Sequence, residues 1–279
     1  MTNNTNAFKP GAQPPQFCII TPTAYLEKYA VQSKTHLVLA HLVDVDDAYA
    51  AFYKQRSLAG DRLIMDNGAF ELGESYAPDR LVELGHKCGA HALVLADYPF
   101  VESAKTVEAA KRLIPQVKAA GFATFFVPQS KTGDFEDWIS AYQWAAENDD
   151  IDIIGMSILG VPNAIPHIPI AYARVVMTQL LMDRGLLANK HHHYLGLNSA
   201  PNVEIPPLLA LGALDTCDSS NPTWCGINGI QYNETYSDWM GIQKKYLREV
   251  DFNEHFSKKA HIHKAIQTNI DMTMGLFNG

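Results

Sequence analysis

The sequence predicts an α/β fold, a single (β/α)8 TIM barrel that carries a C-terminal helical extension. Eight short apolar runs recur along the chain, separated by segments whose apolar residues fall at steps of three and four. The runs are rich in Val, Ile and Leu rather than alternating, as is typical of parallel strands covered on both faces. The length of 279 residues suits one such barrel. A doubly wound open sheet is the alternative, disfavoured because no Gly-x-Gly-x-x-Gly turn follows an early strand.

The elements follow from these runs in chain order. The expected strands are 17–21, 36–43, 62–65, 92–96, 123–127, 151–156, 194–197 and 211–217. The expected helices are 44–58, 78–88, 102–119, 134–147, 169–184 and 203–211. Gly60, Gly89, Gly121 and Gly185 lie where helices should end, which fits the left-handed conformation that glycine adopts at a helix C-terminus.

The two ends of the chain differ from the barrel pattern. Residues 1–16 are polar and Pro-rich, so we expect a flexible N-terminal arm before a single barrel domain over 17–279. Residues 222–279 are expected to form the helical extension. Within it, Ile262, Ile266 and Ile270 fall at four-residue steps, which predicts a helix packed across the outside of the barrel.

Composition limits the class of protein. No apolar run is long enough to span a bilayer, and Cys18, Cys88, Cys217 and Cys225 lack the spacing of a disulfide framework or a zinc ribbon, so a cytoplasmic, metal-free protein without membrane association is expected. The net charge of −8 argues against a broad phosphate-binding surface. A local basic cluster over 244–264 is read equally well as a nucleic-acid contact or as a solvated helix face.

Polar residues break the apolar runs at the carboxyl ends of the expected strands, the face of a (β/α)8 barrel where active sites are built. In chain order they are Asp66 and Asn67, followed by Phe70, and then Asp97, Gln129, Gly155 with Ser157, Asn198, and Asp218. Each one alone fits a helix cap or a satisfied turn. Together they are costly to remove from water unless they bind or transform a polar ligand.

This set favours a flat molecule rich in hydrogen-bonding groups. Asp97 and Gln129 complement the donor and acceptor edge of a purine, Gly155 lets a ligand approach the backbone, and Phe70 offers a stacking face. The stretch 214–222 supplies Asp218 as the candidate nucleophile, and Asp66 is the second catalytic acid.

The order of these motifs resembles the tRNA-guanine transglycosylases and their DpdA-type relatives, which modify DNA in phages and bacteria. Asp66-Asn-Gly-Ala-Phe70 is similar to the family stretch that holds the general acid/base and the stacking aromatic residue. The base-recognition positions of the family are matched by Asp97, Gln129 and the pair Gly155-Met156. Its His-Tyr-Leu segment is similar to His193-Tyr-Leu-Gly196, and the stretch that ends in its nucleophile is similar to Asp215-Thr-Cys-Asp218.

The resemblance implies exchange of guanine for a 7-deazaguanine such as preQ0 or preQ1, through a covalent intermediate on Asp218, without a cofactor. Its site residues are then Asp218 and Asp66 for catalysis, with Asp97, Gln129, Gly155, Phe70, Asn67, Met156, Ser157 and Gly196 binding the base. The cysteines of the family's zinc site are missing, so no metal is expected. The short chain and its negative charge favour DNA over tRNA as the partner.

Two other classes of protein remain open. A barrel that binds purines without catalysis would use Asp97, Gln129 and Phe70, and a (β/α)8 hydrolase or aldolase would use the same acids on a free small molecule. The run His191-His192-His193 is interpreted as a surface turn and not as a metal site, since adjacent strand residues point to opposite faces.

Overall fold

Eight parallel strands form the centre of the computed structural model, which describes residues 8–11, 13–197, 199–241, 251–254 and 259–278. The strands are β1 (Gln16–Ile19), β2 (Thr35–Val38), β3 (Arg62–Met65), β4 (Ala92–Val94), β5 (Ala123–Phe126), β6 (Ile153–Gly155), β7 (His191–Tyr194) and β8 (Thr216–Ser219). Their order in the sheet is β1-β8-β7-β6-β5-β4-β3-β2, so consecutive strands from β2 to β8 pair with one another and β8 pairs with β1. The expected (β/α)8 barrel is confirmed.

The barrel closes where β1 meets β2. These strands lie side by side, and the buried hydroxyl of Ser33 joins them, because its Oγ is 2.6 Å from the carbonyl oxygen of Phe17 and 2.7 Å from that of Thr35. A side chain therefore bridges the seam between the first and last strands of the sheet.

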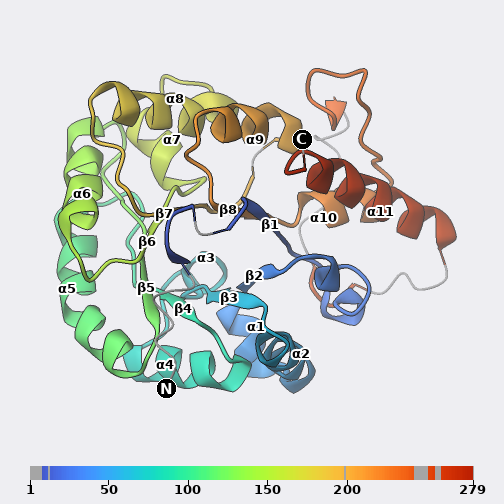
Figure 1. Ribbon diagram of the computed structural model, residues 1–279, viewed down its shortest axis with the longest axis horizontal. Coiled ribbons are helices and arrows are strands. Elements are labelled where there is room, and N and C mark those ends of the chain that lie inside the picture. Colours follow the sequence, from blue (N-terminus) through green and yellow to red (C-terminus); the bar gives the residue numbers. More distant parts are fainter. Residues whose placement is uncertain (1–7, 12, 198, 242–250, 255–258, 279) are drawn as a thin grey trace.

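Helices surround the strands on the outside (Figure 1). They are α1 (Ala40–Val45), α2 (Asp47–Leu58), α3 (Ala69–Leu72), α4 (Pro78–Cys88), α5 (Ser103–Ala119), α6 (Phe135–Glu147), α7 (Gly160–Ala164), α8 (Ile170–Asp183), α9 (Pro201–Ala210), α10 (Asn221–Ile227) and α11 (Ala260–Gly275). As expected, Gly60, Gly89, Gly121 and Gly185 have positive φ angles at or just beyond helix ends. The core fills the barrel and the layer between its strands and helices, with Phe125, Ile153 and Trp138 fully buried.

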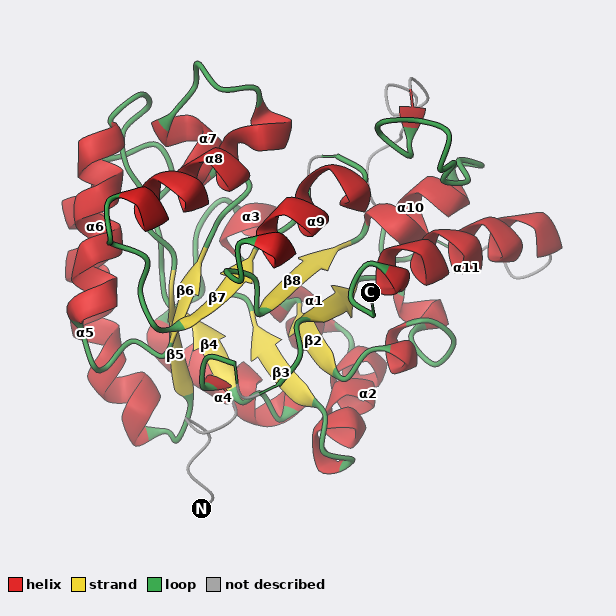
Figure 2. Cartoon of the chain, turned by 45° about the horizontal axis from the view of Figure 1, so that its top comes forward, coloured by secondary structure: helices red, strands yellow, loops and turns green. Residues whose placement is uncertain are grey.

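The C-terminal extension covers one side of the barrel. Helix α11 packs against α10 and reaches β1, burying Ile262, Ile266 and Ile270 as their spacing predicted (Figures 1 and 2). Most of the basic cluster over 244–264 lies outside the described residues, as does the strand-end residue Asn198. No helix in the described part of the chain has the length and apolar character to cross a membrane.

Three elements differ clearly from the sequence-based expectation. The strand expected over 211–217 begins only at Thr216 and ends at Ser219. The run 36–43 is not one strand, because β2 ends at Val38 and α1 begins at Ala40. The histidines 191–193 are not a surface turn but form the buried strand β7. This strand is stable inside the protein because each ring finds a partner: His191 and His193 contact Thr216 inside the barrel, and His192 contacts the hydroxyl of Tyr142 on its outside.

Candidate active site at the carboxyl ends of the strands

The acids expected at the strand ends do come together at the carboxyl end of the barrel. Asp66 and Asn67 follow β3, Asp97 lies three residues after β4, and Gln129 lies three residues after β5. Asp218 lies within β8 near its carboxyl end. Asp215, three residues earlier, precedes β8 and accepts hydrogen bonds from the backbone of His192 and Gly11, so it belongs to the opposite end of the barrel.

Asp66 is held in its protonated form at neutral pH. Burial, first of all, and the nearby carboxylates of Glu71 and Asp218 together raise the pKa of its carboxyl group to about 8, whereas the backbone N–H of Ala40 opposes them by donating to Oδ1 at 2.6 Å. Burial and the charge of Asp218 also raise the pKa of Glu71. Asp66, Glu71 and Asp218 thus interact electrostatically, and the protonated Asp66 is a hydrogen-bond donor at pH 7.

Asp218 is fixed through one of its two carboxylate oxygens. Its Oδ1 accepts a hydrogen bond from the backbone N–H of Gly196 at 3.0 Å and lies 3.0 Å from Nε2 of His193. The residue is only 4% exposed. Oδ1 is thus held from two directions, whereas no hydrogen bond to Oδ2 is found among the described residues.

Asp97 forms a second polar group with Asn67 and Gln129. The amide of Asn67 donates to Oδ1 of Asp97 at 2.8 Å, and the amide of Gln129 donates to Oδ2 at 2.6 Å. Burial raises the pKa of Asp97 although both hydrogen bonds lower it. Oε1 of Gln129 is buried and has no hydrogen-bond partner among the described residues, which leaves an acceptor beside this group.

The residues expected at the end of β6 have structural contacts of their own. An added Cβ at Gly155 would lie 2.5 Å from the Phe125 ring, so close packing inside the barrel accounts for this glycine. Met156 is fully buried, and the Ser157 hydroxyl accepts from the backbone N–H groups of the turn that begins α7. Their contacts with a ligand stay predictions, as does stacking on Phe70, whose ring on α3 is 75% exposed.

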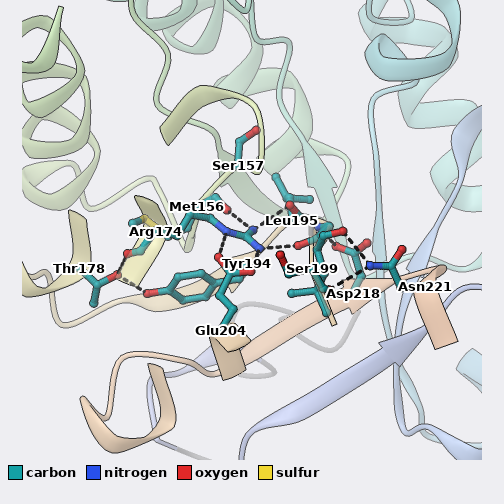
Figure 3. A network of polar contacts seen from close by, with 12 residues as sticks. Met156, Ser157, Arg174, Thr178, Tyr194, Leu195, Ser199, Glu204, Asp218 and Asn221 are labelled. Carbon is teal, nitrogen blue, oxygen red and sulfur yellow. Dashed lines mark hydrogen bonds and ion pairs between the residues drawn. The ribbon is translucent and has the colours of Figure 1, made fainter. Parts of the chain in front are cut away.

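A buried ion pair that the sequence did not reveal supports this end of the barrel (Figure 3). Arg174 of α8 makes two hydrogen bonds of 2.6 Å to Glu204 of α9, and neither residue is more than 2% exposed. The remaining guanidinium N–H groups donate to the carbonyl oxygens of Met156, Leu195 and Gly196. Arg174 therefore holds the ends of β6 and β7, including Gly196, whose N–H group donates to Asp218.

Within the described ranges, no group of three or more His, Cys, Asp or Glu side chains is arranged to hold a metal ion. Lysine is also missing from the buried residues of those ranges.

Comparison with known proteins identifies the fold but no family. No family model matches, and no curated protein matches. Among solved structures, an HpcH/HpaI aldolase/citrate lyase family protein from Burkholderia cenocepacia J2315 is 13% identical, with 82% of this chain and 96% of that chain covered and a TM-score of 0.54. A putative dihydrodipicolinate synthetase from Pseudomonas aeruginosa is 8% identical (96% and 81% covered, TM-score 0.49). N-acetylneuraminate lyase from Fusobacterium nucleatum is 12% identical (95% and 84% covered, TM-score 0.49).

These findings correct the functional expectation. The structure that matches with a TM-score of 0.54 is named as a protein of an aldolase/citrate lyase family. The expected membership of the transglycosylase superfamily, the glycosyltransferase class and the DNA, tRNA or 7-deazaguanine partners are therefore wrong. The reason lies in the fold. Any (β/α)8 barrel presents polar residues in chain order at its strand ends, so short acidic motifs in that order reflect the barrel as much as the reaction.

Proposed function

We propose that this protein is an enzyme of lyase or aldolase type, acting on a small polar carbonyl compound with Asp66 as general acid and Asp218 as general base. The observation that carries the proposal is the pair itself: a carboxyl group with a pKa of about 8 beside a carboxylate that interacts with it. In many active sites, the surroundings of two acids push their pKa values apart, so that one serves as the acid and the other as the base.

The pair would catalyse enolisation. Oδ2 of Asp218 would take a proton from the carbon beside the carbonyl group, while the protonated Asp66 gives its proton to the carbonyl oxygen, which yields an enol. The enol carbon would then attack the carbonyl carbon of an aldehyde while the enol hydroxyl returns its proton to Asp66 and the protonated Asp218 gives its proton to the aldehyde oxygen. The reverse sequence would cleave a β-hydroxycarbonyl compound. A buried, neutral carboxylic acid is suited to stabilise the developing enolate oxygen.

The charges at the strand ends favour an uncharged substrate. The charges of Glu71 and Asp218 raise the pKa of Asp66, the charge of Asp218 raises the pKa of Glu71, and an anionic substrate would add to this repulsion. The buried guanidinium of Arg174 is bound to Glu204. Small hydroxyketones and aldoses therefore fit better than oxo acids. The likeness in fold to an aldolase/citrate lyase family protein is compatible with this class.

Proton exchange in D2O tests the proposal directly. The protein would be incubated with hydroxyacetone, dihydroxyacetone or pyruvate, and loss of the ¹H signal beside the carbonyl group would be followed by NMR. We expect exchange with the two neutral ketones and little with pyruvate. Asp218→Asn and Asp66→Asn should each reduce exchange by a factor of about 10² to 10⁴, the usual contribution of one acid or base.

The matched control is Asp149→Asn, which changes an exposed aspartate remote from the strand ends and should leave the rate unaltered. Exchange that persists in both active-site variants would refute the assignment of the acids. Exchange with pyruvate alone would refute the preference for neutral substrates.

A further inference from the structure

A hydrogen-bonded chain runs through the interior of the barrel below Asp218. His191 and His193, two residues apart on β7, both face Thr216 on β8. Oγ1 of Thr216 lies 2.8 Å from Nε2 of His191 and 2.8 Å from Nδ1 of His193, and Nε2 of His193 lies 3.0 Å from Oδ1 of Asp218. All four residues are at most 4% exposed, so their hydrogen bonds to one another replace those to water.

When the rings of His191 and His193 are both neutral, only two arrangements of hydrogen-bond donors and acceptors are possible in this chain. A threonine hydroxyl has one hydrogen, so Thr216 donates to one histidine and accepts from the other. Burial and the neighbouring His193 hold the pKa of His191 well below its usual range, so that ring carries a single N–H. Either Thr216 donates to His193 and both rings carry their hydrogen on Nε2, or it donates to His191 and both carry it on Nδ1.

The contacts of Asp218 favour the first arrangement. In the second, the bare Nε2 of His193 would face Oδ1 of Asp218, which already accepts from the backbone N–H of Gly196. Two lone pairs would then meet at 3.0 Å inside the protein, with no hydrogen between them. In the first, Nε2–H of His193 donates to that oxygen, and each contact of the chain pairs one donor with one acceptor.

We infer that His193 is a positioning residue for Asp218, and that Thr216 and His191 fix the tautomer in which it works. The hydroxyl of Thr216 donates to Nδ1 of His193, so the ring presents Nε2–H to Oδ1 and keeps Oδ2 of Asp218 turned to the substrate. The role of this pair in a reaction rests on the proposed function. The tautomers themselves do not, because they follow from the distances within the chain when both rings are neutral.

Nitrogen NMR of ¹⁵N-histidine-labelled protein tests the tautomers without any substrate. Two-bond ¹H–¹⁵N spectra, with rings assigned through backbone-to-ring correlations, should show Nε2 protonated and Nδ1 unprotonated for both His191 and His193. Protonated Nδ1 on both rings would establish the opposite direction and overturn the inference. A doubly protonated His193 would overturn it as well, since Thr216 would then donate to His191.

The isosteric variant Thr216→Val tests the positioning role, with Thr216→Ser as the matched control. In the valine variant, Nδ1 of His193 should lose the chemical-shift signature of an accepted hydrogen bond, and the serine variant should restore it. For exchange with hydroxyacetone, kcat should fall by about two- to tenfold in the valine variant, the effect of one hydrogen bond, while KM stays unchanged and serine recovers the rate. An unchanged kcat in Thr216→Val would refute the positioning role.

The two proposals fail separately. If wild-type protein exchanges none of the ketones but shows the expected tautomers, the proposed reaction is wrong and the hydrogen-bonded chain stands. If exchange depends on Asp218 but His193 carries its hydrogen on Nδ1, the reaction stands and the inference is wrong. The wild-type spectrum decides the tautomers even if the valine variant does not fold.

Discussion

Replacing Arg174 by methionine should destabilise the protein strongly. The guanidinium group is fully buried and is the ion-pair partner of Glu204, which is only 2% exposed. Without it, a carboxylate stays inside the protein unpaired, which costs about 3–5 kcal/mol. The carbonyl oxygens of Met156 and Gly196 also lose their charged donors. The free energy of unfolding from urea titration, followed by circular dichroism, should therefore fall by at least about 3 kcal/mol.

Two further variants show whether the loss of stability comes from the buried ion pair. Arg184→Met removes an exposed arginine that reaches Glu136 at 3.4 Å, and it should change stability by less than about 1 kcal/mol. The double variant Arg174→Met/Glu204→Leu removes both buried charges, so its destabilisation should be clearly smaller than the sum of the single effects. A cost for Arg174→Met no larger than that for Arg184→Met would refute the reasoning, as would strict additivity in the double variant.

Two further predictions follow from the site. Because the pKa of Asp66 in the folded protein is about 8, above its ordinary value of 3.8, the native state keeps a proton that the unfolded chain releases, and stability from this group falls as pH rises from about 4 to about 8. Asp66→Asn should remove this loss, so urea titrations should show the variant gaining stability over wild type between pH 5 and pH 8; equal differences at both pH values would contradict the raised pKa. Gly155→Ala should cost about 1–3 kcal/mol because its Cβ would meet Phe125 at 2.5 Å, whereas Gly275→Ala, with open space around it, should not lower the melting temperature.

The barrel could be predicted because most of its strands are apolar. β3 and α4 have the bounds that the sequence suggested, since an uninterrupted apolar run and an amphipathic segment each mark their own ends. Strands β7 and β8 could not be placed in the same way. Their residues are His191–Tyr194 and Thr216–Ser219, which are polar yet buried because they pair with each other inside the barrel. Polarity alone is therefore a poor guide to exposure where neighbouring strands satisfy one another.

The site was predictable only in part, for a related reason. Strand ends give the positions of Asp66, Asp97 and Asp218, because a barrel brings these ends to one face. The partners that hold them come from elsewhere in the chain. Arg174 and Glu204 lie 30 residues apart on two helices whose apolar spacing conceals a buried ion pair. Such a pair becomes visible only when the two helices are placed side by side.

The reaction depends on electrostatics that no strand-end motif contains. The same aspartate is a base when its pKa is ordinary and an acid when burial and nearby carboxylates raise that pKa. For Asp66 the deciding neighbours are Glu71, on the short helix that follows it, and Asp218, more than 150 residues away in the sequence. The order of the motifs suggested base exchange on nucleic acid. That order indicates which residues come together at the strand ends, but not their protonation. In the proposed function, the raised pKa of Asp66 and the inferred hydrogen bond from His193 to Asp218 suit these residues to transfer protons to and from a small carbonyl compound.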